Sequence, residues 1–285
     1  MKIGLYKIGR DIAFIDKPTT KIYQPVMKAF RDFLQPEHDV SAMKTETHYD
    51  VLIVDTGVIS DEKKLPQFKD FTSRLVFVDS DPYLTEKLPK DFMEAIDDVV
   101  VFNDREKIWF PDAKIHKLPV WTMLYTIVEQ YANIENPLKD GLYYGSEEKD
   151  RLGEILEFVY RPDPKITYNL RLPSLGFDNW TTLDDYYFRL GRAYYTIMIE
   201  DLAYYLLQQT TVRYYEALLM WTMPLATPGF FTFNKQFPSV KNYTELTRII
   251  NTTDVYINYW KTLRNERAKF LAEYKQLPQL IKGIL

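Results

Sequence analysis

The sequence predicts an α/β protein of two domains, each built on a doubly wound sheet, with the two domains facing each other across a cleft. At 285 residues the chain is longer than one ordinary domain and long enough for two. Short apolar segments alternate with stretches of helical spacing, which is the pattern of α/β folds. This alternation restarts at Gly141, so we expect one sheet before this residue and a second sheet after it.

In the first block, residues 49–55 (YDVLIVD) and 74–79 (RLVFVD) are nearly continuous apolar runs, the pattern of parallel strands that are buried on both faces. Residues 24–34 carry apolar side chains at helical spacing and predict a helix. Further strands are expected at residues 2–8, 38–42, 98–102 and 114–118. Residues 121–137 are expected to leave this domain as a helix and a linker.

The second block opens with residues 141–146 (GLYYGS), a predicted strand that leads into a glycine turn. The helices expected after it are 151–158, 184–192, one that starts at Thr211 and ends in a Met-Pro turn, 243–250 and 255–280. The strands are 165–170, 194–199 and 224–226, and residues 177–179 are expected to form a polar turn. We place the domains at 1–135 and 136–260, followed by a terminal helical segment at 261–285.

Composition excludes several classes of site. Zero cysteines exclude disulfides and thiolate metal ligands, and His38, His48 and His116 are too scattered for a metal-binding motif, so no metal site is predicted. The longest apolar runs are too short for a bilayer and the first residues contain no signal-peptide core, so we expect a soluble cytosolic protein. The net charge of -4 argues against broad nonspecific affinity for DNA.

Aspartates stand at the ends of two predicted strands. In open α/β sheets, ligands bind outside the carboxyl ends of the strands, so Asp55 and Asp79 are candidates for chemistry, and Asp81 lies close by in the sequence. An aspartate directly after a strand is equally expected as a helix N-cap or a turn residue. The residues alone leave both roles open for each of the three acids.

Arg213 and Glu216 carry the strongest binding signal. Three residues apart on a helix, they share one face, where the arginine can neutralise phosphate and the glutamate can accept hydrogen bonds from two ribose hydroxyls. An ordinary surface ion pair is the alternative. Gly145 followed by Arg151 on a predicted helix forms a second, weaker phosphate-binding pattern, and the nearby Glu147 and Glu148 would repel an anion unless they point away.

Taken together, these motifs resemble a family of known enzymes. Two Rossmann-like domains, a glycine at the start of the second and an Arg-x-x-Glu helix in its later half are similar to nucleotide-sugar glycosyltransferases of the GT-B architecture, and more narrowly to the DNA β-glucosyltransferases of T-even bacteriophages. The residues that carry the resemblance are the MKI start with Gly9, Asp79, Tyr144-Gly145-Ser146, Arg151, Glu157-Phe158, Ile199-Glu200-Asp201, Thr211-Val212-Arg213, Glu216, Arg264, Arg267 and Ala268.

The resemblance implies a UDP-sugar donor, with UDP-glucose favoured, bound mainly by the second domain. It implies double-stranded DNA with hydroxymethylated bases, 5-hydroxymethylcytosine first among them, as acceptor at the first domain. The residues implied to bind the donor are Gly145, Ser146, Arg151, Asp201, Arg213 and Glu216. Asp79 is implied to be the general base of an inverting transfer. A loosely bound divalent cation such as Mg²⁺ is compatible with the resemblance.

The family also implies a monomer in the cytoplasm of an infected bacterial host, whose terminal helix crosses back to the first domain. The apolar ending LPQLIKGIL fits such a crossing. An arginine early in the family's phosphate loop falls near Glu148-Lys149, where only Lys149 could replace its charge. Three alternatives stay open: a sugar already attached to the base as acceptor, a GT-B enzyme with an acceptor other than DNA, and a binding module without activity.

Overall fold

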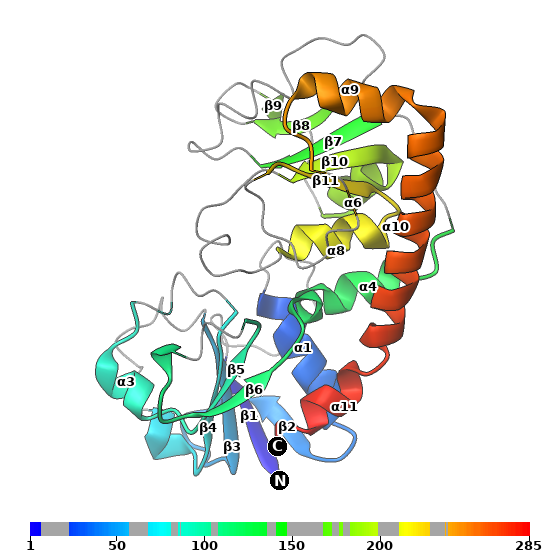
Figure 1. Cartoon of the computed structure of the whole chain (residues 1–285). Coiled ribbons are helices and arrows are strands. Elements are labelled where there is room, and N and C mark those ends of the chain that lie inside the picture. The colour runs from blue at the N-terminus through cyan, green and yellow to red at the C-terminus, as the bar shows by residue number, and fades with distance from the viewer. Residues whose placement is uncertain are drawn as a thin grey trace. The chain divides into compact units, whose positions relative to one another are not determined.

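The computed structural model describes residues 1–6, 23–56, 68–80, 85, 87–103, 108–135, 141–146, 168–172, 177–178, 183–198, 211–228, 237 and 239–285. Two compact units emerge (Figure 1): Met1–Thr126 together with Tyr274–Leu285, and Ile127–Glu273. The domain boundaries at 135/136 and 260/261 stay a prediction. Within the part of the chain that is described, every helix is too short or too polar to cross a bilayer.

The first unit contains a parallel six-stranded sheet with the order β2-β1-β3-β4-β5-β6 (Figure 1). Its strands are β1 (Lys2–Tyr6), β2 (Asp39–Ala42), β3 (Val51–Asp55), β4 (Leu75–Val78), β5 (Asp98–Val101) and β6 (Lys114–Lys117). Every residue of β3, β4 and β5 is buried. The continuous apolar runs therefore predicted central strands correctly.

Helices and aromatic side chains complete the first unit. The helices are α1 (Tyr23–Leu34), α3 (Lys90–Glu94), a 3-10 helix η4 (Val120–Leu124) and α4 (Tyr125–Tyr131), which continues into the second unit. Helix α1 buries Val26, Phe30 and Leu34, which recur every four residues on one face. On another part of the core, Phe92 from α3 packs edge-to-face against Phe68 and Phe77.

The second unit contains a five-stranded sheet with the order β11-β10-β7-β8-β9. Its strands are β7 (Gly141–Ser146), β8 (Tyr168–Leu172), β9 (Phe177–Asp178), β10 (Ala193–Met198) and β11 (Met223–Ala226). All neighbours are parallel except β8 and β9. The predicted polar turn at 177–179 was wrong, because Phe177 and Asp178 pair with Leu172 and Arg171 as a short antiparallel edge strand.

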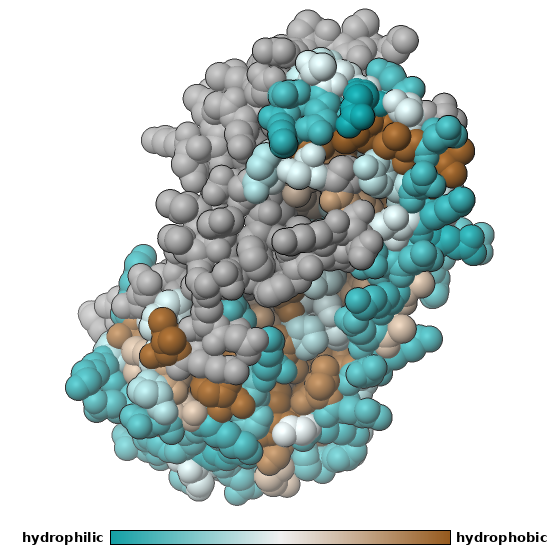
Figure 2. Space-filling model, in the orientation of Figure 1, coloured by the Kyte–Doolittle hydropathy of each residue, from teal (hydrophilic) through white to brown (hydrophobic). Residues whose placement is uncertain are grey.

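The helices of this unit are α6 (Leu183–Arg192), α8 (Val212–Leu219), α9 (Tyr243–Asn251) and α10 (Thr253–Tyr274). Figure 2 shows mostly hydrophilic side chains along the outer side of α10, while Leu263, Arg267 and Phe270 are buried. The single terminal helix predicted at 255–280 is in fact two, α10 and α11 (Leu277–Lys282). Pro278 lacks a backbone N–H and is tolerated only in the first turn of a helix, so a new helix starts beside it.

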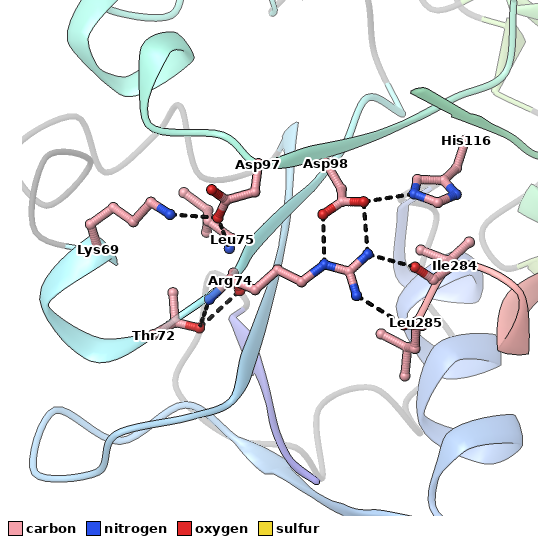
Figure 3. A network of polar contacts seen from close by, with 9 residues as sticks. All are labelled: Lys69, Thr72, Arg74, Leu75, Asp97, Asp98, His116, Ile284 and Leu285. Atoms are coloured by element: carbon pink, nitrogen blue, oxygen red, sulfur yellow. Dashed lines mark hydrogen bonds and ion pairs between the residues drawn. The ribbon is translucent and has the colours of Figure 1, made fainter. Parts of the chain in front are cut away.

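The end of the chain returns to the first unit, as predicted. Helix α11 packs against α1, and Lys282 forms an ion pair with Glu37. Arg74 donates hydrogen bonds from Nη2 to the Ile284 carbonyl oxygen at 2.9 Å and from Nη1 to the Leu285 oxygen at 3.0 Å (Figure 3). These contacts fasten the final residues to the amino-terminal end of β4, which Arg74 directly precedes.

The guanidinium of Arg74 makes a second pair of contacts, which hold it in place (Figure 3). Arg74 binds both oxygens of Asp98, at 2.6 and 2.7 Å, and His116 Nε2 lies 2.7 Å from Oδ1. Burial works to raise the pKa of Asp98, but the hydrogen bonds from Arg74 and His116 outweigh it, and the pKa is lowered. Because the network lies at the amino ends of β4 and β5, it is a structural anchor rather than a ligand site.

Replacing Arg74 by methionine is expected to lower the free energy of unfolding by about 3 kcal/mol near neutral pH, because Asp98 is left buried without its cation. A lowered carboxylate pKa stabilises the fold above the ordinary value of 3.8, and this stabilisation is lost as the pH falls through the lower folded value. The difference between the variant and the native protein should therefore shrink in acid, as measured by urea unfolding at several pH values.

Lys69→Met is the matched control, because Lys69 pairs with Asp97 in the same network but both side chains are more than a third exposed, at 35% and 40%. We expect its effect to stay below about 1 kcal/mol. Equal losses for the two variants would contradict the anchoring role of Arg74.

Candidate functional site

Helix α8 presents the predicted Arg-x-x-Glu pair. It follows Thr211 and places Arg213 and Glu216 within its first two turns. In the sequence, α8 lies between β10 and β11, and these two strands are parallel neighbours in the sheet. Helix α8 therefore begins near the carboxyl end of β10 and runs back along the sheet. Arg213 therefore lies at the sheet edge where ligands bind in open α/β domains. Arg213 is partly exposed, whereas Glu216 has an exposed fraction of only 9%.

A tyrosine from another helix contacts this glutamate. The hydroxyl of Tyr187, on α6, donates a hydrogen bond to Glu216 Oε1 at 2.7 Å, and Tyr187 is 2% exposed. Sequence reasoning missed this residue, since the contact joins positions 29 apart and neither spacing nor residue type distinguishes Tyr187 from the other 21 of the 22 tyrosines. The alternative of an ordinary surface ion pair does not describe Glu216 fully, because Glu216 is buried in the second unit and its carboxylate accepts a hydrogen bond from Tyr187.

The carboxyl end of α8 is closed by a Schellman motif. Thr222 N–H donates to Ala217 O at 2.8 Å and Trp221 N–H donates to Leu218 O at 3.2 Å. The predicted Met-Pro turn was wrong, because the turn lies at 220–222 and Met223 and Pro224 already belong to β11. Pro224 is tolerated there because β11 is the outermost strand of its sheet.

Trp221 occupies the position of this motif that usually holds glycine, with φ 59°. A side chain in this left-handed region costs about 1–2 kcal/mol. Three contacts offset the cost: Trp221 Nε1 donates to Ile134 O at 2.7 Å, its ring stacks on Trp260 with centroids 5.7 Å apart, and the Arg267 guanidinium lies 4.6 Å from the ring centroid. The turn that ends α8 is therefore held by a backbone carbonyl after α4 and by two side chains of α10.

Arg267, on α10, joins the ends of two helices. Its Nε donates to the oxygen of Leu219, the last residue of α8, at 3.0 Å, and its Nη2 donates to Ala132 O at 2.9 Å and Tyr131 O at 3.4 Å, at the end of α4. Positive charge is favourable at helix carboxyl termini. The side chain is 6% exposed, and burial lowers the pKa of the guanidinium to about 10, so it remains protonated at neutral pH.

The other predicted donor-binding residues divide into two groups. Gly145 and Ser146 belong to β7, which continues through both residues, so the predicted turn at Gly145 was wrong. The pairing of β7 with β8 shifts register between Tyr143 and Ser146, and a glycine is common at such an irregularity. Since β7 is the parallel neighbour of β10, its carboxyl end and the start of α8 lie at the same sheet edge. Arg151 and Asp201 lie outside the described residues.

In the first unit, the predicted general base directly follows β4. Asp79 is 0% exposed, its backbone N–H donates to Val100 O on β5, and the hydroxyl of Thr85 donates to Asp79 Oδ1 at 2.5 Å. Asp55 ends the neighbouring strand β3 and is also buried. Adjacent parallel strands thus bring two carboxylates to one edge of the sheet. Asp81, the third acid, lies outside the described residues.

The buried hydroxyl of Thr56 joins these two strand ends. Thr56 Oγ1 donates to Val78 O at 3.0 Å and accepts from Ser80 N–H at 2.8 Å. Because Thr56 follows Asp55 and Ser80 follows Asp79, the bonds fix the backbone beside both acids. A carboxylate held in this way can accept a proton from a substrate hydroxyl. No group of three or more histidine, aspartate or glutamate side chains among the described residues is arranged to hold a metal ion.

No protein-family model matches the chain, and no curated relative matches it. Among solved structures, the DNA-modifying enzyme β-glucosyltransferase, solved in the presence and absence of uridine diphosphoglucose, has a TM-score of 0.64 and 16% identity, over 99% of this chain and 98% of that one. The Anabaena protein HepE in complex with UDP and glucose has a TM-score of 0.50 and 10% identity, over 99% of this chain and 100% of that one. These likenesses and the parallel sheet establish the GT-B fold.

Proposed function

We propose that this protein is a glycosyltransferase that moves a sugar from a UDP-sugar to a hydroxymethylated base of double-stranded DNA, with 5-hydroxymethylcytosine as the favoured base and UDP-glucose as the favoured donor. The observation that carries the proposal is the arrangement at one edge of the second sheet, where Arg213 and Glu216 in the first turns of α8 lie at the same edge as the end of β7. The end-to-end likeness to a DNA-modifying β-glucosyltransferase supports it.

The donor would be held by charge and by hydrogen bonds. The start of α8 carries the positive end of the helix dipole, and Arg213 adds a full positive charge for the diphosphate, to which Arg151 would contribute. The Glu216 carboxylate would accept hydrogen bonds from the ribose hydroxyls. Gly145 and Ser146 would border the diphosphate, and Asp201 would shape the site near the sugar. Positive charge also stabilises the UDP that leaves.

The transfer would proceed by direct displacement. The acceptor hydroxyl oxygen attacks the anomeric carbon, the bond from this carbon to the diphosphate oxygen breaks, and Asp79 takes the hydroxyl proton. This step inverts the anomeric configuration. Because Asp79 is 0% exposed, an acceptor would reach it only after neighbouring residues move. A divalent cation such as Mg²⁺ would assist the departure of the diphosphate if one binds with the donor.

A second candidate acceptor is a hydroxyl that is not part of DNA, which the net charge of -4 favours because DNA-binding proteins usually carry excess positive charge. Incubation with a panel of UDP-sugars and duplexes with or without hydroxymethylated cytosine, followed by nucleoside mass spectrometry, separates the two candidates. A glycosylated nucleoside supports the DNA acceptor. Hydrolysis or transfer of the sugar without any modified nucleoside favours the other. We also propose that the protein is a monomer that works in the cytoplasm of a phage-infected bacterium.

Arg213→Ala is expected to weaken UDP binding by about 1.5–3 kcal/mol, the range for hydrogen bonds to charged groups. Titration calorimetry measures the effect directly. Arg248→Ala is the matched control, because Arg248 lies on α9 with 72% of its side chain exposed, and its UDP affinity should stay native. Unchanged UDP affinity in a folded Arg213→Ala protein would remove Arg213 from the donor site.

A further inference from the structure

The Tyr187–Glu216 contact gives the proposed ribose-binding carboxylate a partner inside the protein. A buried tyrosine hydroxyl needs a hydrogen-bond partner, and a carboxylate is a strong one because the bond is assisted by charge. The 2.7 Å separation of Tyr187 Oη and Glu216 Oε1 is typical of such a bond. An ionised carboxylate has about four acceptor positions on its two oxygens, and the tyrosine bond uses one of them.

The tyrosine and its helix are held by further contacts. Thr222 Oγ1, in the turn after α8, donates to Leu190 O at 2.5 Å, which ties α6 to the carboxyl end of α8. The ring of Tyr131 packs on the ring of Tyr187 with centroids 5.4 Å apart and an interplanar angle of 34°. Helices α6 and α8 are therefore joined at two places, by the Thr222–Leu190 bond and by the Tyr187–Glu216 bond. A hydroxyl that comes from such a support can set the direction of a neighbouring carboxylate.

We propose that Tyr187 is a positioning residue that orients Glu216 and thereby sets the preference of the donor site for ribose. This inference rests on the proposed function, since it takes Glu216 as the ribose contact. A site built to hydrogen-bond a hydroxyl discriminates against a ligand that lacks it, because the buried acceptor is then left unpaired. The discrimination is largest when the acceptor is already oriented before the ligand binds.

The test compares UDP with 2′,3′-dideoxyuridine diphosphate, which keeps the base and the diphosphate but lacks both ribose hydroxyls. Tyr187→Phe keeps the ring and removes only the hydroxyl. Its affinity for UDP is expected to fall about fivefold to tenfold, the loss of one modest hydrogen bond, while its affinity for the dideoxy nucleotide changes less than about twofold. Tyr49→Phe is the control, because Tyr49 is buried in the first unit and donates to Ala42 O.

Glu216→Gln, alone and combined with Tyr187→Phe, distinguishes failure of this inference from failure of the proposed function. If Glu216→Gln keeps native discrimination, the ribose contact itself is wrong. If Glu216→Gln loses discrimination but Tyr187→Phe keeps it, or if Tyr187→Phe weakens both nucleotides equally, the positioning role alone is overturned. Loss of discrimination in Tyr187→Phe, with little further loss when it is added to Glu216→Gln, supports the inference. Thermal melting without nucleotide confirms that each variant is folded.

Discussion

Asp79→Asn is expected to slow sugar transfer by about 10²–10⁴-fold, the usual contribution of a positioned proton acceptor, while UDP affinity stays native. Asparagine keeps the size of the side chain and can still accept the hydrogen bond from Thr85, so the local structure should persist. It cannot take up a proton from the acceptor hydroxyl. Single-turnover assays with saturating donor isolate the transfer step, and calorimetry measures UDP binding separately.

Asp55→Asn and Asp81→Asn are the matched comparisons, and both are expected to have much smaller effects on the rate. Asp55 is the informative one, because it ends the neighbouring strand and is buried like Asp79. If Asp79→Asn transferred sugar at a near-native rate, the role of base would pass to Asp55 or Asp81. A retaining reaction in which the leaving phosphate takes the proton would explain the same result, and the anomeric configuration of the product decides between them.

The strands were predictable from sequence because the signal for a central parallel strand is local. β3 and β4 are buried on both faces, so nearly every residue in them must be apolar, and the run stops where the strand stops. The positions of Asp55 and Asp79 at the ends of these strands were predictable for the same reason. The position of Asp79 after β4 follows from the sequence, whereas its burial and its bond to Thr85 depend on how later segments pack around it.

One error in the predicted fold arose where tertiary pairing decided the outcome. Phe177 and Asp178 form a strand only because β8 offers an edge to pair with, and a polar segment gives no local sign of this. The break between α10 and α11 was a different kind of error, since Pro278 was visible in the sequence and forbids a continuous helix. The turn after α8 was misplaced because Trp221 occupies a position where glycine is the usual signal.

At the candidate site, Arg213 and Glu216 could be proposed from the sequence because their spacing on one helix is local information. Tyr187 and Arg267 could not be assigned roles in the same way. Each acts through the end of a side chain that reaches a partner far away in the sequence. Arg267, for example, lies 48 positions after Leu219. Their chemistry becomes visible only once α6, α8 and α10 are placed around the second sheet.

Arg267→Ala is expected to lower the free energy of unfolding by about 3 kcal/mol, as judged from the range for hydrogen bonds to charged groups. The variant would leave the carbonyl oxygens at the ends of α4 and α8 without their donor and would remove the cation that packs on Trp221. Urea unfolding followed by tryptophan fluorescence suits the measurement, since Trp221 and Trp260 stack beside Arg267. Arg264→Ala is the control, because Arg264 is exposed on the same helix.

Arg267→Met tests whether the charge or the volume matters. Some buried ion pairs can be replaced by apolar side chains without loss, because both charged partners are removed together. Here every hydrogen bond of Arg267 with the described residues goes to a backbone carbonyl, which no substitution removes. Methionine should therefore be nearly as destabilising as alanine, and lysine, which lacks the planar fork, should recover only part of the loss. Native stability in Arg267→Met would show instead that Arg267 acts mainly by filling space between α4, α8 and α10.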